Sequence, residues 1–537
     1  MALRNKIILL FPFFLLSYSL HAQQINRYLV FFKNKTGTPY SVAQPDQFLS
    51  QKAIDRRTKQ GILISEEDLP VNPAYISDVK GTGAKTYFTS RWMNGVLIET
   101  DQATLDQIKL IPSVDRTEYV APNKKLGGRI RKIRSRKENS LAPATKTQLQ
   151  MLGIDKMQED GFIGQGMTVA VFDGGFLGVN TAIPFQSIFQ ENRIVDSFDF
   201  VARSGNVFAY DDHGTEVLSI IGAYNEGNYT GGAYKANFQL YVTEDVDSEN
   251  RIEEYNWLFA AERADSAGVD VINSSLGYNL FDDPSMDYTK AQLDGKTAVI
   301  SKAASKAIAR GIVVVCSAGN EGNNSWQLVT PPADVDGVLA IGSVSSSNSK
   351  STFSSIGPTS DNRIKPDVVA LGSGTSVIKP SGVLTSESGT SVACPLITSL
   401  VAGVWQAYPQ LTAAEMYQTI IRSADEFSQP TNFKGYGLPS YALTTGYLES
   451  ATQDNEIILY PNPITGSSMN ILIKNPSTEP AQIQVFAIDG KLVAELRQLI
   501  TSSNNPFECN FSSLLAGTYL VKVKSGAHLK IARLVRP

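Results

Sequence analysis

The sequence predicts an α/β fold with a parallel, doubly wound sheet at the centre of the chain, preceded by a small α+β unit and followed by a small all-β sandwich. Between residues 146 and 447, apolar β-branched runs alternate with helical stretches, which is typical of a parallel sheet with helices on both faces. Residues 23–122 contain fewer strands and helices, in the pattern of a small α+β unit. Residues 456–537 hold short alternating strands separated by turn residues, as β-sandwiches do.

The first 22 residues have the features of a secretory signal peptide. Arg4 and Lys6 form a basic start, residues 7–16 are apolar, and Ala22 is a suitable last residue of the signal. The apolar run is too short to span a bilayer easily, although an uncleaved N-terminal anchor is the alternative. The sequence therefore predicts export and removal of residues 1–22.

Residues 23–122 are expected to form a β-α-β-β-α-β unit, the element order of ferredoxin-like folds. One helix is expected at residues 45–61 and ends at Gly61, and a shorter one at residues 103–111. The expected strands are residues 27–32, 84–90, 94–100 and 114–120.

A basic linker, residues 123–145, follows this unit. Eight of the sixteen residues from 124 to 139 are Lys or Arg, and they show no apolar period. An exposed basic linker is a place where proteases cut, so a processing site is expected there. Nucleic acid is not an expected partner, because the linker has no interleaved aromatic residues and the net charge of the chain is −4.

The central region, residues 146–447, is expected to contain strands that are buried on both faces. Their near-continuous apolar character indicates a parallel sheet, and functional groups in such sheets gather at the carboxyl ends of the strands. The expected strands are residues 167–172, 238–244, 269–275, 311–318 and 338–344, with helices at 252–268 and 298–311.

Three residues of this region are candidate catalytic groups. Asp173 follows a predicted buried strand, and His213 is the one histidine of three that lies in the α/β region, where it could act as a general base. Ser391 stands at the start of a long apolar helix, where free N–H groups and the helix dipole favour an attacking alkoxide. Taken singly, each has an ordinary alternative: a turn residue, a structural histidine and a helix cap.

A fourth candidate is the side-chain amide of Asn320, which follows the predicted strand at 311–318. Such an amide could donate a hydrogen bond to a developing oxyanion, although a simple turn would have the same residues. Ser391 is not in the G-x-S-x-G motif of lipases, because Ala393 replaces the second glycine.

The order Asp, His, Asn, Ser and the motifs around these residues resemble the subtilisin-like serine peptidases, the subtilase family. The resemblance implies an endopeptidase in which Ser391 is the nucleophile, His213 its base and Asp173 the group that orients the base. It also implies an oxyanion hole formed by Asn320 and the backbone N–H of Ser391. The matching motifs are D-G-G, H-G-T-x-V, S-S-L-G, S-A-G-N-E-G and G-T-S-V-A-C-P. The implied substrate-binding residues are Ser274, Ser275, Leu276, Gly277, Ser317, Ala318 and Gly319.

Some residues depart from the pattern of the family. Gly174 stands where the family usually has Ser or Thr, so one hydroxyl beside Asp173 is lost. Val392 and Cys394 replace commoner residues near the nucleophile. None of these changes removes a catalytic group.

The two flanking units also resemble known domains. Residues 23–122 match the propeptides of these enzymes in position and element order, so the chain's own propeptide is an expected inhibitor. Residues 456–537 resemble the sorting domain of the bacterial type IX secretion system, with a carbohydrate-binding or spacer sandwich as the alternative. This implies the type IX machinery as a partner and a bacterial protein that is secreted or attached to the cell surface. The matching segments are residues 460–463, 489–491 and 515–519 and a basic tail at 530–536.

No cofactor is expected to be required, and no metal ligands are predicted. The acidic stretch 244–254 lacks the glycine and spacing of an EF-hand, so it is expected to be a solvated loop and helix start. A structural calcium ion is common in the family, but no clear motif supports one here. Cys316 and Cys394 are expected to be small buried apolar residues, and three cysteines make no disulfide framework.

Two rival functions remain open for the sequence. One is a catalytically inactive subtilisin-like protein used for binding, and the other is a serine hydrolase that does not cleave peptides.

Overall fold

The computed structural model divides the chain into two compact units. One contains Met1–Phe48, Ile64–Arg129 and Asn250–Ile252, and the other contains Leu49–Leu63, Ile130–Glu249 and Glu253–Pro537. The expected signal peptide, the linker up to residue 144 and the sorting-motif residues 461–463 and 489 lie outside the described residues. The described residues are 24–122, 145–454, 457–460, 464, 467–474, 476–488, 490–500, 506–526 and 528–536.

The first unit is built on an antiparallel sheet of order β2-β3-β1-β4. Alternate residues of β1, among them Val30, form a core with Val79 of helix α2 and Leu105 of helix α3. This strand order confirms the ferredoxin-like prediction. The elements are β1 (Asn26–Phe32), α2 (Pro73–Gly81), β2 (Lys85–Ser90), β3 (Gly95–Thr100), α3 (Gln102–Ile108) and β4 (Val114–Pro122).

The helix expected at residues 45–61 is present as α1 (Gln51–Lys59), but it belongs to the second unit. The helix between β1 and β2 that packs in the first unit is α2, which the sequence analysis missed. Helix α1 does not cover the sheet of the first unit because it reads QKAIDRRTK and has no apolar face. Helix α2 supplies Val79 to the core and is capped by Asn72, whose side chain accepts a hydrogen bond from the backbone of Ala74.

The second unit contains a seven-stranded sheet of order β13-β12-β11-β10-β5-β9-β6, in which every pairing is parallel. The five expected strands are confirmed with shifts of a few residues at their ends. Strands β6 and β13 were not predicted, because one alternates with polar residues and the other has only four residues. The strands are β5 (Thr168–Asp173), β6 (Ile194–Asp199), β9 (Asn237–Val242), β10 (Val271–Ser274), β11 (Val313–Ser317), β12 (Leu339–Val344) and β13 (Val368–Leu371).

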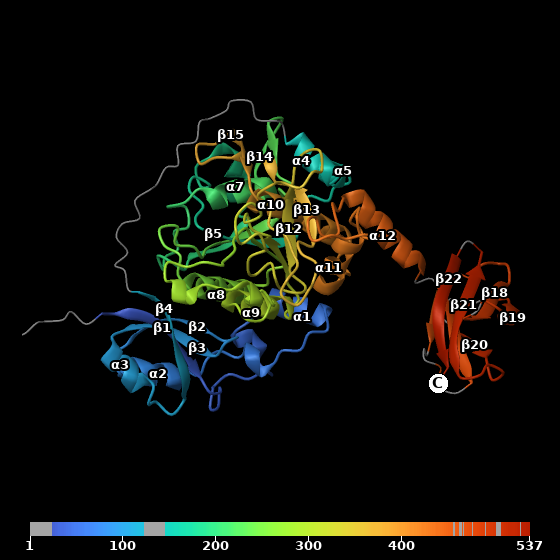
Figure 1. The fold of residues 1–537 in the computed structure, drawn as a ribbon, viewed down its shortest axis with the longest axis horizontal. Coiled ribbons are helices and arrows are strands. Elements are labelled where there is room, and N and C mark those ends of the chain that lie inside the picture. Colours follow the sequence, from blue (N-terminus) through green and yellow to red (C-terminus); the bar gives the residue numbers. More distant parts are fainter. Residues whose placement is uncertain are drawn as a thin grey trace, which may run out of the picture. The chain divides into compact units, whose positions relative to one another are not determined.

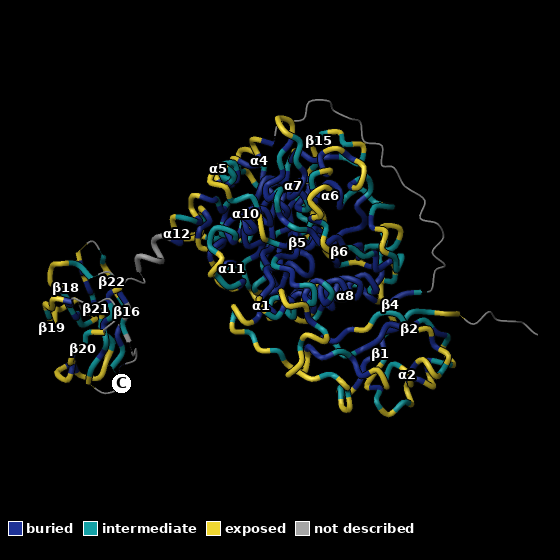
Figure 2. Tube along the Cα trace, turned by 180° about the vertical axis from the view of Figure 1, so that it is seen from behind, coloured by how far each residue is buried: buried dark blue, intermediate teal, exposed yellow. Residues whose placement is uncertain are grey.

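Helices cover both faces of this sheet, as the doubly wound prediction requires (Figure 1). Val169 and Val171 of β5 lie in the core that also contains residues of α7 and α10. Phe172, which points to the other face, packs edge-on against Trp257 of α8 with 5.2 Å between ring centroids. Figure 2 shows β5 and α10 within the buried part of the trace. The helices are α7 (His213–Gly222), α8 (Ile252–Ala267), α9 (Val299–Ile308), α10 (Thr390–Ala407), α11 (Ala413–Arg422) and α12 (Tyr441–Asp454).

Helix α10 is the one helix of the described residues that is long and apolar enough to cross a membrane. Most of it is buried inside the second unit, where it packs on β10, β11, β12 and β13. Its apolar character is therefore explained by its place in the core.

The C-terminal part of the chain forms two antiparallel sheets, of order β16-β17-β20 and β19-β18-β21-β22, which confirms the β-sandwich. Residues such as Ile471, Ile483 and Val521 form a separate core for it. The expected basic tail is a strand, β22 (His528–Arg536), which pairs along its whole length with β21 (Gly517–Ser525). The other strands are β16 (Ile457–Tyr460), β17 (Ser468–Ile473), β18 (Ala481–Ala487), β19 (Leu492–Gln498) and β20 (Phe507–Asn510).

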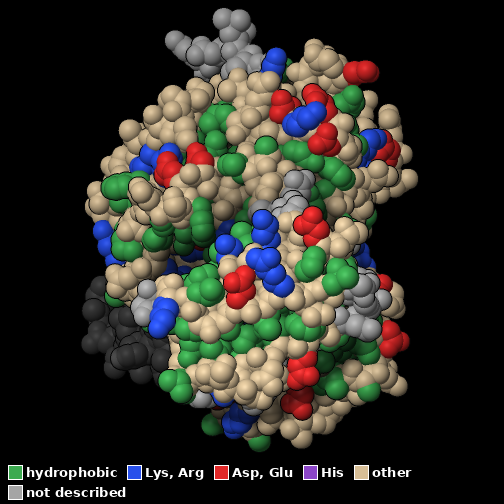
Figure 3. All heavy atoms as spheres, turned by 90° about the vertical axis from the view of Figure 1, so that its right-hand side faces the viewer, with side chains coloured by type: hydrophobic (Ala, Val, Ile, Leu, Met, Phe, Trp, Pro, Cys, Tyr) green, Lys and Arg blue, Asp and Glu red, His purple; other side chains and the backbone are tan. Residues whose placement is uncertain are grey.

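The surface carries charges of both signs. Figure 3 shows one face, on which Lys and Arg side chains lie among Asp, Glu and apolar side chains. Interspersed charge of this kind suits a protein of small net charge, here −4.

Candidate active site

Asp173 and His213 form a hydrogen-bonded pair at the carboxyl end of β5. Asp173 is the last residue of β5 and is fully buried, and His213 is the first residue of α7. The imidazole Nδ1 lies 2.9 Å from Oδ1 and 3.0 Å from Oδ2 of the carboxylate. With the Nδ1 proton held by Asp173, the Nε2 atom is left to exchange a proton with another group.

Glycines allow the start of α7 to approach the end of β5. A Cβ atom on Gly214 would lie 2.4 Å from the carbonyl oxygen of Gly175 and 2.9 Å from Cβ of Asp173. A Cβ on Gly174 would lie 2.9 Å from Val246 Cγ1. The backbone N–H of Gly174 donates to Asp173 Oδ1, at 2.8 Å. The departure at Gly174 therefore still leaves the carboxylate with a second donor.

Two opposing effects set the pKa of the His213 imidazole. Burial lowers it, whereas the negative charge of Asp173, followed by the charges of Glu216 and Asp211, raises it, and the net result is a pKa above the ordinary 6.5. Burial raises the pKa of Asp173 above its ordinary 3.8, partly offset by its interactions with His213. The imidazole of His213 is therefore a stronger base than an ordinary histidine, because it lies next to the buried carboxylate of Asp173.

Ser391 lies in the first turn of α10, where its backbone carbonyl accepts a hydrogen bond from Ser275 Oγ at 2.8 Å. Gly389, two residues before Ser391, leaves the space beside the serine side chain open. A Cβ on Gly389 would lie 2.9 Å from Ser391 Oγ and 3.8 Å from Asn320 Nδ2. The Ser391 hydroxyl and the Asn320 amide therefore both lie close to Gly389, where any side chain would crowd them.

The amide of Asn320 is oriented by Thr390, a residue that the sequence analysis missed. Asn320 Oδ1 accepts hydrogen bonds from the backbone N–H of Thr390 at 2.9 Å and from its hydroxyl at 3.1 Å. The same hydroxyl accepts a hydrogen bond from the N–H of Gly319 at 3.2 Å. Because Oδ1 is occupied, Nδ2 is the polar atom that Asn320 can offer to a ligand. The one feature of the sequence that could have indicated this role is the position of Thr390 directly before the candidate nucleophile.

The seven residues that were expected to bind substrate follow two adjacent strands. Ser274 ends β10 and Ser317 ends β11, so the segments after them leave the same edge of the sheet. The hydroxyl of Ser274 accepts a hydrogen bond from Trp257 Nε1 at 3.0 Å, and the hydroxyl of Ser275 is bonded to Ser391, so both are used within the protein. Contact with a substrate there falls to the backbone and to Leu276, which lines the cavity beside His213.

A cavity of about 450 Å³ opens beside the Asp173–His213 pair. Leu276 contributes to its lining, and among the described residues no lysine or arginine does. Seven further carboxylates line it: Asp211, Glu244, Asp245, Asp247, Glu249, Glu253 and Asp282. The cavity is therefore strongly acidic and directly joined to the candidate catalytic pair.

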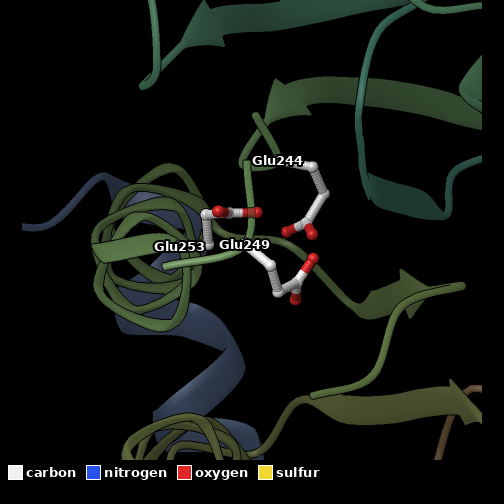
Figure 4. A group of neighbouring side chains, drawn as sticks. All are labelled: Glu244, Glu249 and Glu253. Atoms are coloured by element: carbon white, nitrogen blue, oxygen red, sulfur yellow. The ribbon is translucent and has the colours of Figure 1, made fainter. Parts of the chain in front are cut away.

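Three of these carboxylates, Glu244, Glu249 and Glu253, point toward one another, with oxygen atoms within 4.8 Å (Figure 4). Burial raises the pKa of Glu244 to about 7, and burial together with the charge of Glu244 raises that of Glu249 to about 8. Calcium takes six to eight oxygen ligands, so these three carboxylates, at one oxygen atom each, would supply only part of such a set.

The acidic stretch 244–254 is less solvated than expected. Glu253 and Glu254 are buried at the start of α8, and Glu254 accepts hydrogen bonds from the Tyr288 hydroxyl at 2.8 Å and the Ile300 N–H at 3.1 Å. The expectation of a solvated helix start was wrong, because both residues are buried and partners from a later segment satisfy the Glu254 carboxylate. The expectation for the cysteines is confirmed, since Cys316, Cys394 and Cys509 are all free and buried.

Comparison with known families gives three matches. Residues 164–438 match the subtilase family, and residues 27–139 match a peptidase S8 propeptide domain of Bacteroidota. Residues 458–536 match a secretion system C-terminal sorting domain.

Individual proteins are similar to the same regions. Subtilisin DY of Bacillus licheniformis is 30% identical over 278 residues, which is 51% of this chain and 90% of that protein. Subtilisin NAT of Bacillus subtilis subsp. natto is 28% identical over 342 residues, 62% of this chain and 76% of that protein. Among solved structures, MycP1 from Mycobacterium smegmatis is 22% identical with a TM-score of 0.44, covering 56% of this chain and 83% of that one.

Proposed function

The chain belongs to the subtilase family of serine peptidases, and we propose that it cleaves peptide bonds with Asp173, His213 and Ser391 as its catalytic triad and Asn320 in its oxyanion hole. Membership of the family makes it a serine endopeptidase. The propeptide and sorting domains mark it as an exported protein, secreted or held at the cell surface. The observation that carries the proposed triad is the bond of 2.9 Å between His213 Nδ1 and buried Asp173 Oδ1.

In this mechanism His213 Nε2 takes the proton of the Ser391 hydroxyl as Oγ attacks the carbonyl carbon of the substrate. Asp173 stabilises the imidazolium that forms. The negative charge on the former carbonyl oxygen is held by Asn320 Nδ2 and the backbone N–H of Ser391. When the tetrahedral intermediate collapses, the C–N bond breaks and His213 gives its proton to the leaving amine.

The second half of the reaction repeats these roles with water. His213 takes a proton from a water molecule, which attacks the carbonyl carbon of the acyl-enzyme. The bond between that carbon and Ser391 Oγ breaks, and the proton returns to Oγ. None of these steps is routed through a metal ion.

Polypeptides are the proposed substrates, bound through the segments after β10 and β11. The backbone groups of residues 274–277 and 317–319 are proposed to bind the main chain of the substrate. Pairing through the main chain accepts many substrate sequences. Leu276 adds one side chain at the cavity beside His213.

Two further partners are proposed from the flanking domains. The propeptide is proposed to inhibit the peptidase until the basic linker, residues 123–145, is cut. The C-terminal sandwich is proposed to be recognised by type IX secretion machinery, in keeping with its match to a secretion sorting domain.

The decisive experiment separates this proposal from an inactive binding protein and from a different hydrolase. An organophosphate that reacts with activated serines should label the enzyme once, at Ser391, and abolish hydrolysis of casein. Failure to label would favour an inactive relative. Hydrolysis of a short-chain ester without cleavage of casein would favour a hydrolase that does not act on peptides.

A further inference from the structure

Helix α1 is attached to the amino-terminal edge of the peptidase sheet. Its residues fall within the segment that matches the propeptide domain, yet residues 49–63 pack as part of the second unit. Lys52 Nζ donates to Thr168 Oγ1 at 2.6 Å and lies 2.9 Å from Asp270 Oδ2. Thr168 is the first residue of β5, and Asp270 directly precedes β10.

This edge is opposite to the catalytic one. Thr168 and Asp173 are the first and last residues of the same six-residue strand, and at about 3.3 Å per residue its two ends are about 17 Å apart. A helix bound at Thr168 therefore does not cover the triad.

Two buried arginines attach α1 to one buried carboxylate. Arg56 Nη2 lies 2.5 Å from Asp265 Oδ1, and Arg57 Nη2 lies 2.7 Å from Asp265 Oδ2. Arg57 is 1% exposed and Asp265 is 0% exposed. Arg56 also donates to two backbone carbonyls, those of Val269 at 2.6 Å and Arg310 at 3.1 Å.

The same face of α1 makes further polar contacts one turn later. Gln60 Nε2 donates to the carbonyl of Gly311 at 2.8 Å, and its Oε1 accepts from the N–H of Ala413 at 2.9 Å. The helix is therefore held by directional hydrogen bonds. These bonds explain how a helix of polar composition can have buried residues, because its buried arginines have a carboxylate partner.

The peptidase surface is shaped for this close approach. A Cβ on Gly268 would lie 2.7 Å from Lys52 Cβ, and a Cβ on Gly311 would lie 2.7 Å from Gln60 Nε2. Both glycines have positive φ, 84° and 79°, and each lies in the short segment before a central strand, β10 or β11. A larger residue at position 268 would meet Lys52 Cβ and the backbone of Ala53 and would push α1 away, whereas at position 311 it would displace the Gln60 side chain.

We propose that residues 49–63 are a docking segment for a dedicated receptor site on the peptidase, and that this site holds the severed propeptide on the enzyme after the linker is cut. The receptor is formed by Asp265, Asp270 and the carbonyl groups of Val269, Arg310 and Gly311. Because it lies at the edge opposite to Asp173, retention of the propeptide and inhibition of the triad are separate properties.

The experiment uses the full precursor with Ser391→Ala and a recognition sequence for an added, sequence-specific protease placed in residues 123–145. Cleavage then does not depend on the activity of the peptidase itself. After cleavage, an affinity tag on the peptidase part is used to recover both fragments. The propeptide should remain bound in the parent and dissociate in Arg56→Ala/Arg57→Ala, with affinity reduced about 100-fold or more.

Lys59→Ala is the matched control, because it removes a cation from the exposed side of the same helix. It should retain the propeptide as the parent does. Equal retention by the double-arginine variant, or loss of the propeptide from the cut parent, would overturn the proposal.

A second measurement does not depend on the folding of any variant precursor. A synthetic peptide of residues 49–63 is added to the cut parent complex, and displaced propeptide is measured. The parent peptide should displace it, whereas the peptide with Arg57→Ala should need about 100-fold more. Equal potency of the two peptides, or no displacement at millimolar peptide, would contradict the receptor site.

Discussion

Thr390 donates both its backbone N–H and its hydroxyl to the side-chain Oδ1 of Asn320, at 2.9 and 3.1 Å. The residue that directly precedes the nucleophile therefore sets the orientation of the amide proposed to hold the oxyanion. The two catalytic segments, one after β11 and one at the start of α10, are tied together by these bonds.

Removal of the Thr390 hydroxyl should test this link. Thr390→Val keeps the shape and the backbone bond but removes one of the two bonds to Asn320. We expect kcat to fall about tenfold, the loss of roughly one hydrogen bond, with little change in KM. Steady-state kinetics on a peptide substrate measure both. A change in KM alone would place Thr390 in substrate binding.

Asn320 and Ser391 should differ in the size of their effects. Ser391→Ala removes the nucleophile and should lower kcat by about 10⁶, and Asn320→Ala removes one donor and should lower it by about 10²–10³, magnitudes known for a subtilisin relative. The precursor should accumulate in Ser391→Ala, whereas slow self-processing should persist in Asn320→Ala. A rise in KM with unchanged kcat in Asn320→Ala would mean that this residue binds substrate and is not part of the oxyanion hole.

The activity should rise with pH as His213 loses its proton, because only the neutral imidazole is a base. Burial lowers the pKa of His213, but the charge and hydrogen bond of Asp173 together with the charges of Glu216 and Asp211 outweigh burial, so the midpoint of kcat/KM against pH should lie above 6.5. Asp173→Asn removes that charge, so the midpoint should move to lower pH, with kcat reduced about 10⁴-fold. A midpoint that moves upward in Asp173→Asn would contradict the assignment.

The acidic cavity should favour peptides with cationic side chains near the cut. We expect a peptide with Lys to be cleaved about fivefold faster than its Glu counterpart, and the difference to shrink at high salt. Because the pKa of Glu244 is about 7 and that of Glu249 about 8, the preference should grow as pH rises through this range and the carboxyls lose their protons. Glu249→Gln should weaken this preference, and Glu159→Gln, which changes an exposed side chain outside the cavity, should not. Equal rates for both peptides at low salt would refute it.

Deletion of residues 456–537 should leave peptidase activity intact and stop export from the native cell. None of the proposed catalytic residues lies there, and the C-terminal sandwich has its own core, which includes Ile471 and Val521. Activity of the purified, truncated enzyme and the location of the protein in cell fractions are the two measurements. Loss of activity in a folded truncated enzyme would show that the sandwich supports catalysis.

The sequence predicted what depends on local pattern. Asp173 and Asn320 follow strongly apolar runs, so their places at the ends of β5 and β11 could be predicted from the sequence alone. The location of α1 could not, because its arginines are satisfied by Asp265, more than 200 residues further along the chain. Helix α2 was missed for a different reason, because Val79 is its one buried residue and its apolar pattern is weak.

The acidic stretch and Thr390 show the same limit. Glu254 was expected to be solvated, and its partners Tyr288 and Ile300 come from segments that no pattern within 244–254 could reveal. The role of Thr390 depends on a side-chain amide 70 residues away. Strand ends could be predicted, but long-range pairs of polar side chains could not.

Ser391 is mounted on α10, the helix that forms the interior of the peptidase unit from Thr390 to Trp405. Opening of this helix requires disruption of its packing on four central strands, so the amide protons of its buried later turns should exchange with solvent mainly through global unfolding. The nucleophile therefore cannot detach locally while the rest of the enzyme stays intact. Inactivation by heat and loss of the fold should occur as one event, and residual activity then counts the folded molecules.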